Sequence, residues 1–538
     1  MTDDRRRAGP QAETDVLVLG GGPAGGWAAL AAAGAGARVV LADKGYHGTS
    51  GATAPSNTGT WCVPPGEARA EAVERRWQRT HGLADRRWMH RTVDRAYANL
   101  LQLVEWGYAF PRDDQGNLYV ANLRGPDYMH FLRRKVKAAG VTILDHHPAL
   151  ELLSDGDAVT GAAGLSRRSG EDWRIHAGAV VLATGGCAFF ERLMGGGGLT
   201  GDGYLMAAEA GAALSGMEFT GKYTLAPHDS SLNKGLPYRW ASFHRQDGTP
   251  ILDSKGRPLT NGIGGTDHEL ARALLDGPVF ARLDLAEPAM QDWLRRGQPN
   301  CFLPYDRRGI DPFTQLFRVD LTAEGTVRGT GGIRLAGDDC ATEVPGLYAA
   351  GDAASRENVT GASSGGGAVN ASWAMASGWF AGAGAARHAR LRGMRRAAGQ
   401  ALGQAGLRPA AAARPVDHAA LVEALRAETI PLDRNFFRTG DGLAAGRERL
   451  EGVWAEIRDH LSAEGAERLR AREIASVAAS ARWSLAAAEM RRESRGVHRR
   501  ADLPETDAAW TRRITVSGLD RVEARPDFPA TQAQERAS

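Results

Sequence analysis

The clearest pattern of hydrophobic positions lies near the N-terminus. Val16 to Leu19 form a short, wholly apolar run that predicts a buried strand, and the alanine-rich residues after Gly25 predict a helix. A second strand is predicted over Arg38 to Leu41. Strand, helix and strand in this order predict an α/β unit.

Similar patterns continue through the first half of the chain. Glu67 to Trp106 carry arginines and apolar positions at helical spacing, and short strands are predicted from Val141 onward. The glycine-rich loop Gly195 to Gly203 leads into a predicted helix, Tyr204 to Leu214. This loop could simply be flexible, but Asp202 between two glycines favours contact with a ligand.

The pattern is then interrupted and later resumes. From about Glu218 to Leu321 the composition shifts toward Pro, Asp, Arg and aromatic residues, which predicts an inserted domain. A buried strand running into Gly351 and Asp352, and an apolar helix from about Asn370 to Ala385, return to the earlier pattern. From Val416 the remainder is predicted to be mostly helical.

The composition excludes several classes of protein. The 66 basic and 63 acidic residues leave a net charge of +3, which is too even to indicate nucleic-acid binding. The four cysteines lie far apart without a C-x-x-C pair, so we expect reduced thiols, no metal site and no self-contained iron–sulfur cluster. No apolar run predicts a membrane span, and the charged first fourteen residues lack the apolar stretch of a signal peptide. We therefore expect a cytoplasmic protein.

The turn after the first strand carries the strongest chemical signal. Gly20, Gly22 and Gly25 have the G-x-G-x-x-G spacing, in which the glycines allow a tight turn, approach of a pyrophosphate, and close helix packing. The helix N-terminus then presents free N–H groups to the phosphates. Asp43 ends the second strand, where a carboxylate would bind a ribose hydroxyl. Because all these parts occur in order, we expect a bound dinucleotide rather than an ordinary glycine turn.

Five pieces of the sequence together resemble one family. They are GGGPAG (20–25) with Asp43 and Lys44, ATGG (183–186), TGDG (200–203), GLYAAGD (346–352) and RRESRGVHRRADLPETDAAW (491–510). The chain resembles the fumarate reductase / succinate dehydrogenase flavoprotein family, which also includes L-aspartate oxidase and adenylylsulfate reductase. The last piece is the most specific, through Glu493, Ser494, Arg495, Gly496, His498, Asp502 and Pro504.

The resemblance implies an α/β fold with a Rossmann-like FAD-binding domain, interrupted by a capping domain and followed by a helical C-terminal domain. On this basis we expect a disordered tail (1–14), the first part of the FAD-binding domain (15–217), the cap (218–325), the second part (326–395) and the C-terminal domain (416–538).

The resemblance also implies FAD as cofactor and assigns residues to it. The expected FAD-binding residues are Gly20, Gly22, Pro23, Ala24, Gly25, Asp43, Lys44, Ser50, Gly51, Ala149, Ala183, Thr184, Gly185, Asp202, Gly351, Asp352, Asn370 and Ala371. The family's flavin-linking histidine precedes a threonine, but the loop 49–54 has no histidine in register and His47 is misplaced. We therefore expect non-covalent FAD.

Four positions that would hold a dicarboxylate in this family differ here. The two substrate histidines correspond to Tyr223 and Val327, and the substrate arginine corresponds to Gly365 or a small neighbour. The proton-transferring arginine falls around Thr266. Because losing one carboxylate partner costs about 2–5 kcal/mol, these changes argue against fumarate, succinate or aspartate as substrate.

The catalytic candidates are the polar residues expected near the flavin. Arg245 lines up with an arginine of the family's proton relay, although a pairing with Asp247 explains it equally well. Tyr223, His244 and Arg328 complete the set, and a tyrosine or histidine there could act as acid or base. Each could equally be a packed residue of the cap.

Three functions follow from the sequence. The first is an FAD-dependent oxidoreductase acting on a small organic molecule other than a simple C4 dicarboxylate. The second is a flavoprotein subunit with an iron–sulfur or other electron-transfer partner, because the C-terminal motif lies in relatives on the side facing such a partner. The third is a non-catalytic flavin-binding subunit, which the four changed positions suggest and the intact cofactor signals oppose.

Overall fold

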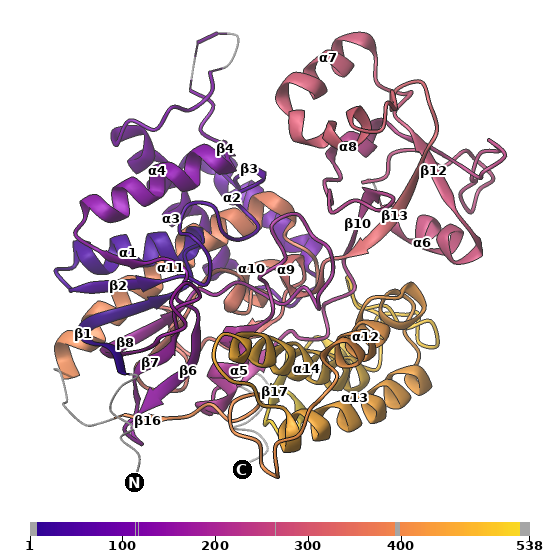
Figure 1. Cartoon of the computed structure of the whole chain (residues 1–538). Coiled ribbons are helices and arrows are strands. Elements are labelled where there is room, and N and C mark those ends of the chain that lie inside the picture. The colour runs from indigo at the N-terminus through magenta and orange to yellow at the C-terminus, as the bar shows by residue number, and fades with distance from the viewer. Residues whose placement is uncertain (1–7, 113–114, 117, 264, 393–398, 528–538) are drawn as a thin grey trace, which may run out of the picture.

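The centre of the molecule is a large mixed sheet (Figure 1). The computed structural model describes residues 8–112, 115–116, 118–263, 265–392 and 399–527. Within these residues the sheet has eight strands in the order β16-β6-β7-β8-β1-β2-β5, with β15 also paired to β8. The parallel strands are β1 (Ala8–Leu19), β2 (Val39–Ala42), β5 (Thr142–Leu144), β8 (Asp172–Leu182) and β15 (Leu347–Ala349). The antiparallel ones are β6 (Ala149–Ser154), β7 (Val159–Leu165) and β16 (Gln400–Ala401).

Helices α1 (Pro23–Gly34) and α11 (Gly366–Arg392) pack directly on each other beside this sheet. The contact is close because α11 carries small residues: a Cβ at Gly378 would lie 2.3 Å from the carbonyl oxygen of Ala24. Trp27 of α1 is fully buried, and its indole N–H donates to the hydroxyl of Tyr128 at 2.8 Å. Around this pair lie α2 (Glu67–Trp77), α3 (Arg86–Glu105), α4 (Gly125–Ala138), β3 (Asn57–Gly59) and β4 (Asn122–Arg124).

The cap is a separate lobe at the upper right of Figure 1. Its antiparallel strands run in the order β10 (Tyr223–Pro227), β13 (Phe317–Ala323), β12 (Val279–Arg282) and β11 (Ser242–His244). It also contains α6 (Asp267–Asp276), α7 (Pro288–Gly297) and α8 (Leu303–Asp306). Tyr238, Phe302, Tyr305 and Phe317 form part of a hydrophobic core that belongs to this lobe.

The C-terminal region, at the lower right of Figure 1, contains α12 (His418–Thr429), α13 (Gly440–His460) and α14 (Glu467–Met490). A second small sheet joins it to the rest, in the order β14 (Gly332–Ile333), β9 (Leu214–Ser215), β17 (Ile514–Ser517) and β18 (Glu523–Pro526). The remaining short helices are α5 (Asp202–Glu209), α9 (Gly325–Arg328) and α10 (Glu357–Thr360). The predicted fold, an α/β domain interrupted by a cap and followed by a helical region, is confirmed.

Several element boundaries differ from those predicted. Strand β1 begins at Ala8, inside the expected tail 1–14, because Ala8 and residues 11–14 pair with β8; residues 1–7 lie outside the described part. The helix predicted over 67–106 is two helices, separated at His81, which has a left-handed φ of 56°. Helix α5 ends at Glu209, and the residues up to 214 turn into β9.

A fully buried ion cluster ties the C-terminal motif to the start of the cap. Arg491 pairs with Glu218 at 2.8 Å and with Glu493 at 2.9 Å, and all three side chains are buried. Arg491 also donates to the carbonyl oxygens of Trp510 and Arg512. Removing one partner of such a cluster leaves an uncompensated buried charge.

We therefore expect Arg491→Met to destabilise the fold by about 3–5 kcal/mol, because Glu218 would remain buried without its ion-pair partner, whereas Glu493 would keep Arg495. The measurement is the midpoint of urea unfolding of the FAD-loaded protein. Arg521→Met is the control, because Arg521 is 90% exposed and its pairing with Glu523 spans 3.7 Å. Equal midpoints for the two variants would contradict this account of the cluster.

Candidate functional site

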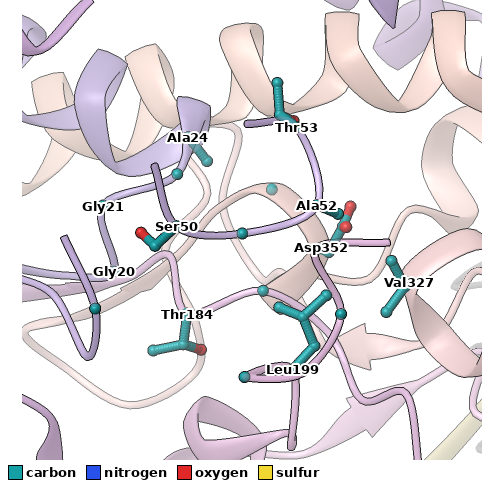
Figure 2. A pocket seen from close by; sticks show the side chains of 18 of the residues that line it. Gly20, Gly21, Ala24, Ser50, Ala52, Thr53, Thr184, Leu199, Val327 and Asp352 are labelled. Atoms are coloured by element: carbon teal, nitrogen blue, oxygen red, sulfur yellow. The ribbon is translucent and has the colours of Figure 1, made fainter. Parts of the chain in front are cut away.

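A long pocket of about 770 Å³ runs along the carboxyl ends of the parallel strands. The residues that follow β1, β2, β8 and β15 all line it, which is where open α/β sheets bind their ligands. Figure 2 shows the glycine turn with Ser50 on one side of the pocket, and Asp352 and Val327 on the other. The pocket therefore extends from the sheet to the chain that connects with the cap.

The glycine turn has the close contacts that its spacing predicts. Gly20 has a φ of 107°, and a Cβ there would lie 2.2 Å from the carbonyl oxygen of Ala183. A Cβ at Gly25 would lie 1.8 Å from the carbonyl oxygen of Gly20, so Gly25 packs behind the turn and does not line the pocket. Gly22 begins α1 without a side-chain cap, and a Cβ there would meet no protein atom within 4 Å. The backbone N–H groups of the first helical turn are therefore available to an anion.

Asp43 and Lys44 follow β2 at the adenosine side expected from the sequence. The carboxylate of Asp43 accepts hydrogen bonds from Gly45 N at 2.7 Å and from Ser50 Oγ at 2.9 Å. Lys44 bridges Asp202 at 2.7 Å and Glu473 of α14 at 2.9 Å. Burial lowers the pKa of Lys44, but these two carboxylates outweigh burial and raise it above its ordinary value.

The ends of β8 and β15 bring two further pieces of the sequence together. Ala183, Thr184 and Gly185 follow β8, while Gly351 and Asp352 follow β15, and all five line the pocket. The Thr184 hydroxyl is buried without a hydrogen-bond partner within the described chain.

Helix α11 begins at Gly366, four residues before the predicted start, so its first turns reach the pocket. Asn370 and Ala371 line the pocket there, and the side-chain oxygen of Asn370 is buried without a partner among the described residues. Unpartnered buried polar atoms are costly unless a ligand satisfies them. Together with the free helix N-terminus, they fit a polar dinucleotide such as FAD.

With the exception of Gly25, every residue predicted to bind FAD lines this single pocket. His47, which sequence reasoning considered and set aside as a covalent attachment point, lies outside the lining. Its Nδ1 is hydrogen-bonded to the carbonyl oxygen of Gly21 at 2.7 Å. The ring therefore supports the glycine turn from behind.

The cap end of the pocket is built by two short segments. Asn233 and Lys234 come from the cap, and Glu324 and Arg328 come from the chain that returns from it. Asn233 Nδ2 donates to Glu324 Oε1 at 2.9 Å, and Arg328 Nε lies 3.0 Å from Glu324 Oε2. Lys234 Nζ donates to Ser56 Oγ of the FAD-binding domain at 2.8 Å, so the cap is closed against that domain here.

Of the four predicted catalytic residues, the pocket includes only Arg328. The hydroxyl of Tyr223 donates to the carbonyl oxygen of Ile430 at 2.7 Å, inside the contact with the C-terminal region. The ring of His244 is bonded to Ser242 and to the carbonyl oxygen of Gly248, within the cap. Arg245 donates to the carbonyl oxygen of Ala273 and lies near Asp276, not Asp247. In this structure the last three do not reach the pocket.

Sequence reasoning missed Asn233, Lys234 and Glu324. Asn233 and Lys234 lie in an irregular part of the cap and belong to no sequence motif. Only their contacts with residues far away in the sequence, seen in the folded structure, identify them. The one available signal was the spacing of Glu324 and Arg328, which are four residues apart and form an ion pair across one helical turn.

Substitution of Gly22 separates folding from cofactor binding. Gly22 has an ordinary φ of −72° and open space at its Cβ position, so Gly22→Ala should fold normally. The added methyl group would stand where a pyrophosphate approaches the turn, and we expect FAD affinity to fall at least about tenfold, about 1.4 kcal/mol. FAD fluorescence titration measures the affinity, and the unfolding midpoint of the FAD-free protein shows whether the variant folds normally. Gly34→Ala at the exposed end of α1 is the control, and retention of full FAD affinity by Gly22→Ala would refute this assignment.

Comparisons with known proteins agree with the pocket. A family model described as an FAD binding domain matches residues 15–279, and one described as the fumarate reductase flavoprotein C-terminus matches residues 428–532. L-aspartate oxidase of Mycobacterium tuberculosis is 29% identical over 95% of this chain and 96% of its own length. A fumarate reductase (CoM/CoB) subunit of Methanothermobacter marburgensis is 25% identical over 94% of this chain and 97% of its own length.

Solved structures share the fold over almost the whole chain. A quinol fumarate reductase FrdA variant of E. coli has a TM-score of 0.80 at 21% identity, covering 96% of this chain and 97% of its own. Adenylylsulfate reductase of Archaeoglobus fulgidus has a TM-score of 0.78 at 19% identity, covering 97% and 96%. Among the described residues, no helix is long and apolar enough to cross a membrane, and no cluster of His, Cys, Asp and Glu is arranged to hold a metal ion.

The family models cover the first part of the cofactor pocket and the C-terminal motif, and the relatives align over almost the whole chain. The pocket supplies the helix N-terminus, carboxylate and unpartnered polar atoms that FAD requires. The chain belongs to the fumarate reductase / succinate dehydrogenase flavoprotein family and is an FAD-dependent oxidoreductase.

Proposed function

We propose that this enzyme transfers a hydride or an electron pair between FAD and a small organic substrate that is not a simple C4 dicarboxylate. Bound FAD would supply the two-electron chemistry. Non-covalent FAD would be held by the glycine turn, Asp43, the ends of β8 and β15, and the start of α11. The substrate would lie at the cap end of the pocket, where contacts between the cap and the FAD-binding domain limit access of water.

The observation that carries the proposal is the charge at the cap end. Of the described basic residues that line the pocket, only Lys234 and Arg328 lie there, and Glu324 pairs with Arg328. Lys44 and Arg167 belong to the other end, where Arg167 donates to the Lys44 carbonyl oxygen at 3.2 Å. These two cations and the Glu324 carboxylate leave a single net positive charge, because the Asp352 carboxylate on the same side forms an ion pair with the buried Arg356. This balance suits a neutral or singly negative substrate, whereas a C4 dicarboxylate would need a partner for each carboxylate.

The four changed positions support the same conclusion. Val327 lines the pocket with an apolar side chain, and the Tyr223 hydroxyl is already bonded to Ile430. At Gly365 a Cβ would lie 2.2 Å from the side-chain oxygen of Asn370, so a larger residue there would displace that side chain. Thr266 donates to the carbonyl oxygen of Asn261 at 3.0 Å, inside the cap.

The names of the relatives, L-aspartate oxidase and fumarate reductase, are the best argument for the competing dicarboxylate function. The identities of 29% and 25% support the shared cofactor more strongly than a shared substrate. The charge of the residues at the cap end, Lys234, Glu324 and Arg328, favours the proposal.

A flavoprotein subunit with an iron–sulfur or other electron-transfer partner is the second candidate. The C-terminal motif that suggested it is largely turned inward: Arg491, Glu493 and His498 are buried and bonded within the chain. These side chains have a structural explanation without a partner. The third candidate, a non-catalytic flavin-binding subunit, is favoured by the position of Tyr223, His244 and Arg245 outside the pocket. Lys234 and Arg328, which line the cap end, argue against it.

The test is the reaction of the reduced enzyme with a panel of acceptors under anaerobic conditions. We expect the purified protein to be yellow, and its dithionite-reduced flavin to reoxidise with fumarate no faster than in buffer. We expect faster reoxidation by some unsaturated or carbonyl compounds that are neutral or singly charged; crotonate is the monocarboxylate matched to fumarate. The oxidative direction is tested with alcohols and amines, which would bleach the oxidised flavin if they are substrates.

Substantial reoxidation by fumarate, or no response to any singly charged or neutral compound, would overturn the proposed substrate class. A colourless protein that takes up no FAD would exclude both catalytic candidates. Co-purification of a small cysteine-rich iron–sulfur protein would instead favour the second candidate.

A further inference from the structure

We propose that Lys234 is the catalytic residue that transfers a proton to or from the substrate during the two-electron step. This inference rests on the proposed function, because it places the reacting substrate at the cap end of the pocket. Lys234 was not among the residues that the sequence indicated; its position, its partners and its charge carry the assignment.

The ammonium group of Lys234 has a hydrogen-bond partner but, in the described part of the chain, no carboxylate close enough to form an ion pair. Its Nζ donates to the Ser56 hydroxyl at 2.8 Å, while the side chain is only partly exposed and lines the pocket. Within the described residues no carboxylate lies within 4.0 Å of this nitrogen, whereas Lys44 and Lys222 each form an ion pair. A lysine that gives up hydration without gaining an anion can lose its proton near neutral pH.

The surrounding charges act in that direction. Burial and the nearby guanidinium of Arg328 lower the pKa of Lys234 to about 8, against the opposing effects of Glu324 and Cys301. At physiological pH the side chain would therefore be present both as an acid and as a base. General acid–base catalysis is most efficient when the pKa lies near the working pH.

The other polar groups at this end have different tasks. Glu324 is fully buried, with one carboxylate oxygen bonded to Asn233 and the other paired with Arg328. A guanidinium group has donors only and is not deprotonated in proteins, so Arg328 is not a candidate for the proton transfer. It can hold a negative group of the substrate and keep the Lys234 pKa low. Lys234 is the group left to move the proton.

The proton balance defines the class of substrate. In oxidation, bound FAD would accept a hydride from a substrate carbon, and the neutral amine of Lys234 would accept the proton of the adjacent O–H, N–H or C–H group. Together they account for the two electrons and two hydrogens lost. In reduction the ammonium donates the proton, so the substrate is a carbonyl, imine or activated alkene. The charge at this site allows it at most one negative charge.

The first experiment measures the ionisation of Lys234 in the FAD-loaded enzyme, without any substrate. Competitive labelling with trace acetic anhydride, read by peptide mass spectrometry, gives the pH at which each lysine is half reactive. We expect Lys234 near pH 8, against about 10.4 for an unperturbed lysine side chain. Arg328→Gln should move the Lys234 midpoint upward because it removes the like charge, while Arg257→Gln, on the cap surface, should not.

A Lys234 midpoint near 10 in the unmodified enzyme, or one that Arg328→Gln leaves unchanged, would overturn the inference. Neither result depends on knowing the substrate. The labelling experiment therefore stands even if the proposed substrate class fails.

The second experiment tests catalysis with a compound that the acceptor panel identifies. Lys234→Arg keeps the charge but cannot release a proton near pH 8, and Lys234→Ala removes the group. Both should bind FAD normally and lose about 10²- to 10⁴-fold in the rate of flavin reduction or reoxidation. Lys255→Ala is the control.

The pH dependence of the rate shows whether Lys234 accepts or donates the proton. If Lys234 acts as a base, the wild-type rate rises as pH increases through about 8; if it acts as an acid, the rate falls over the same interval. In Lys234→Arg this change of rate near pH 8 should disappear. In Lys234→Ala, added methylamine should restore part of the rate. Wild-type rates and an unchanged pH profile in Lys234→Arg would overturn this inference while leaving the proposed function intact.

Discussion

The parallel pairing of β15 with β8 is the constraint on which the rest of the molecule depends. Leu347, Tyr348 and Ala349 pair in register with Val180, Val181 and Leu182, so residues from both sides of the inserted cap end at the same sheet edge. Only this register places the residues after β15 beside those after β8. The cofactor pocket therefore needs residues from the part of the chain before the cap and from the part after it.

This arrangement also explains why the two ends of the pocket differ in chemistry. The sheet end is made of backbone turns and helix starts, whose contacts with a dinucleotide need glycine and small residues. The cap end is made of side chains from a loop of the cap, Asn233 and Lys234, and from the returning chain, Glu324 and Arg328. Side chains in such segments can change without disturbing the sheet. A family can consequently keep FAD while altering the substrate.

The same difference decides what the sequence could predict. Gly20, Asp43 and Asp352 were identifiable because their roles follow from local spacing and from strand ends, and they lie in one pocket. Tyr223 was chosen by alignment and His244 as a polar residue expected near the flavin. In the cap, however, antiparallel pairing and packing determine which side chains face the pocket. Tyr223 instead contacts Phe436 and Ile430 of the C-terminal region. Lys234 needed the three-dimensional contact with Ser56, and no local pattern encodes a contact across 178 residues.

The C-terminal motif acts at the connection to the cap rather than at the pocket. Arg491 holds the Glu218 carboxylate, Arg438 donates to the Glu218 carbonyl oxygen at 2.6 Å, and Arg499 donates to that of Gly221 at 2.9 Å. Three arginines of the C-terminal region thus fix the segment from which β10 leads to Lys234. Since β10 pairs with β13, the same segment also sets the position of the returning strand and of Glu324 beyond it. The motif that identifies the family most specifically therefore positions the cap end of the pocket indirectly, by anchoring the base of the cap.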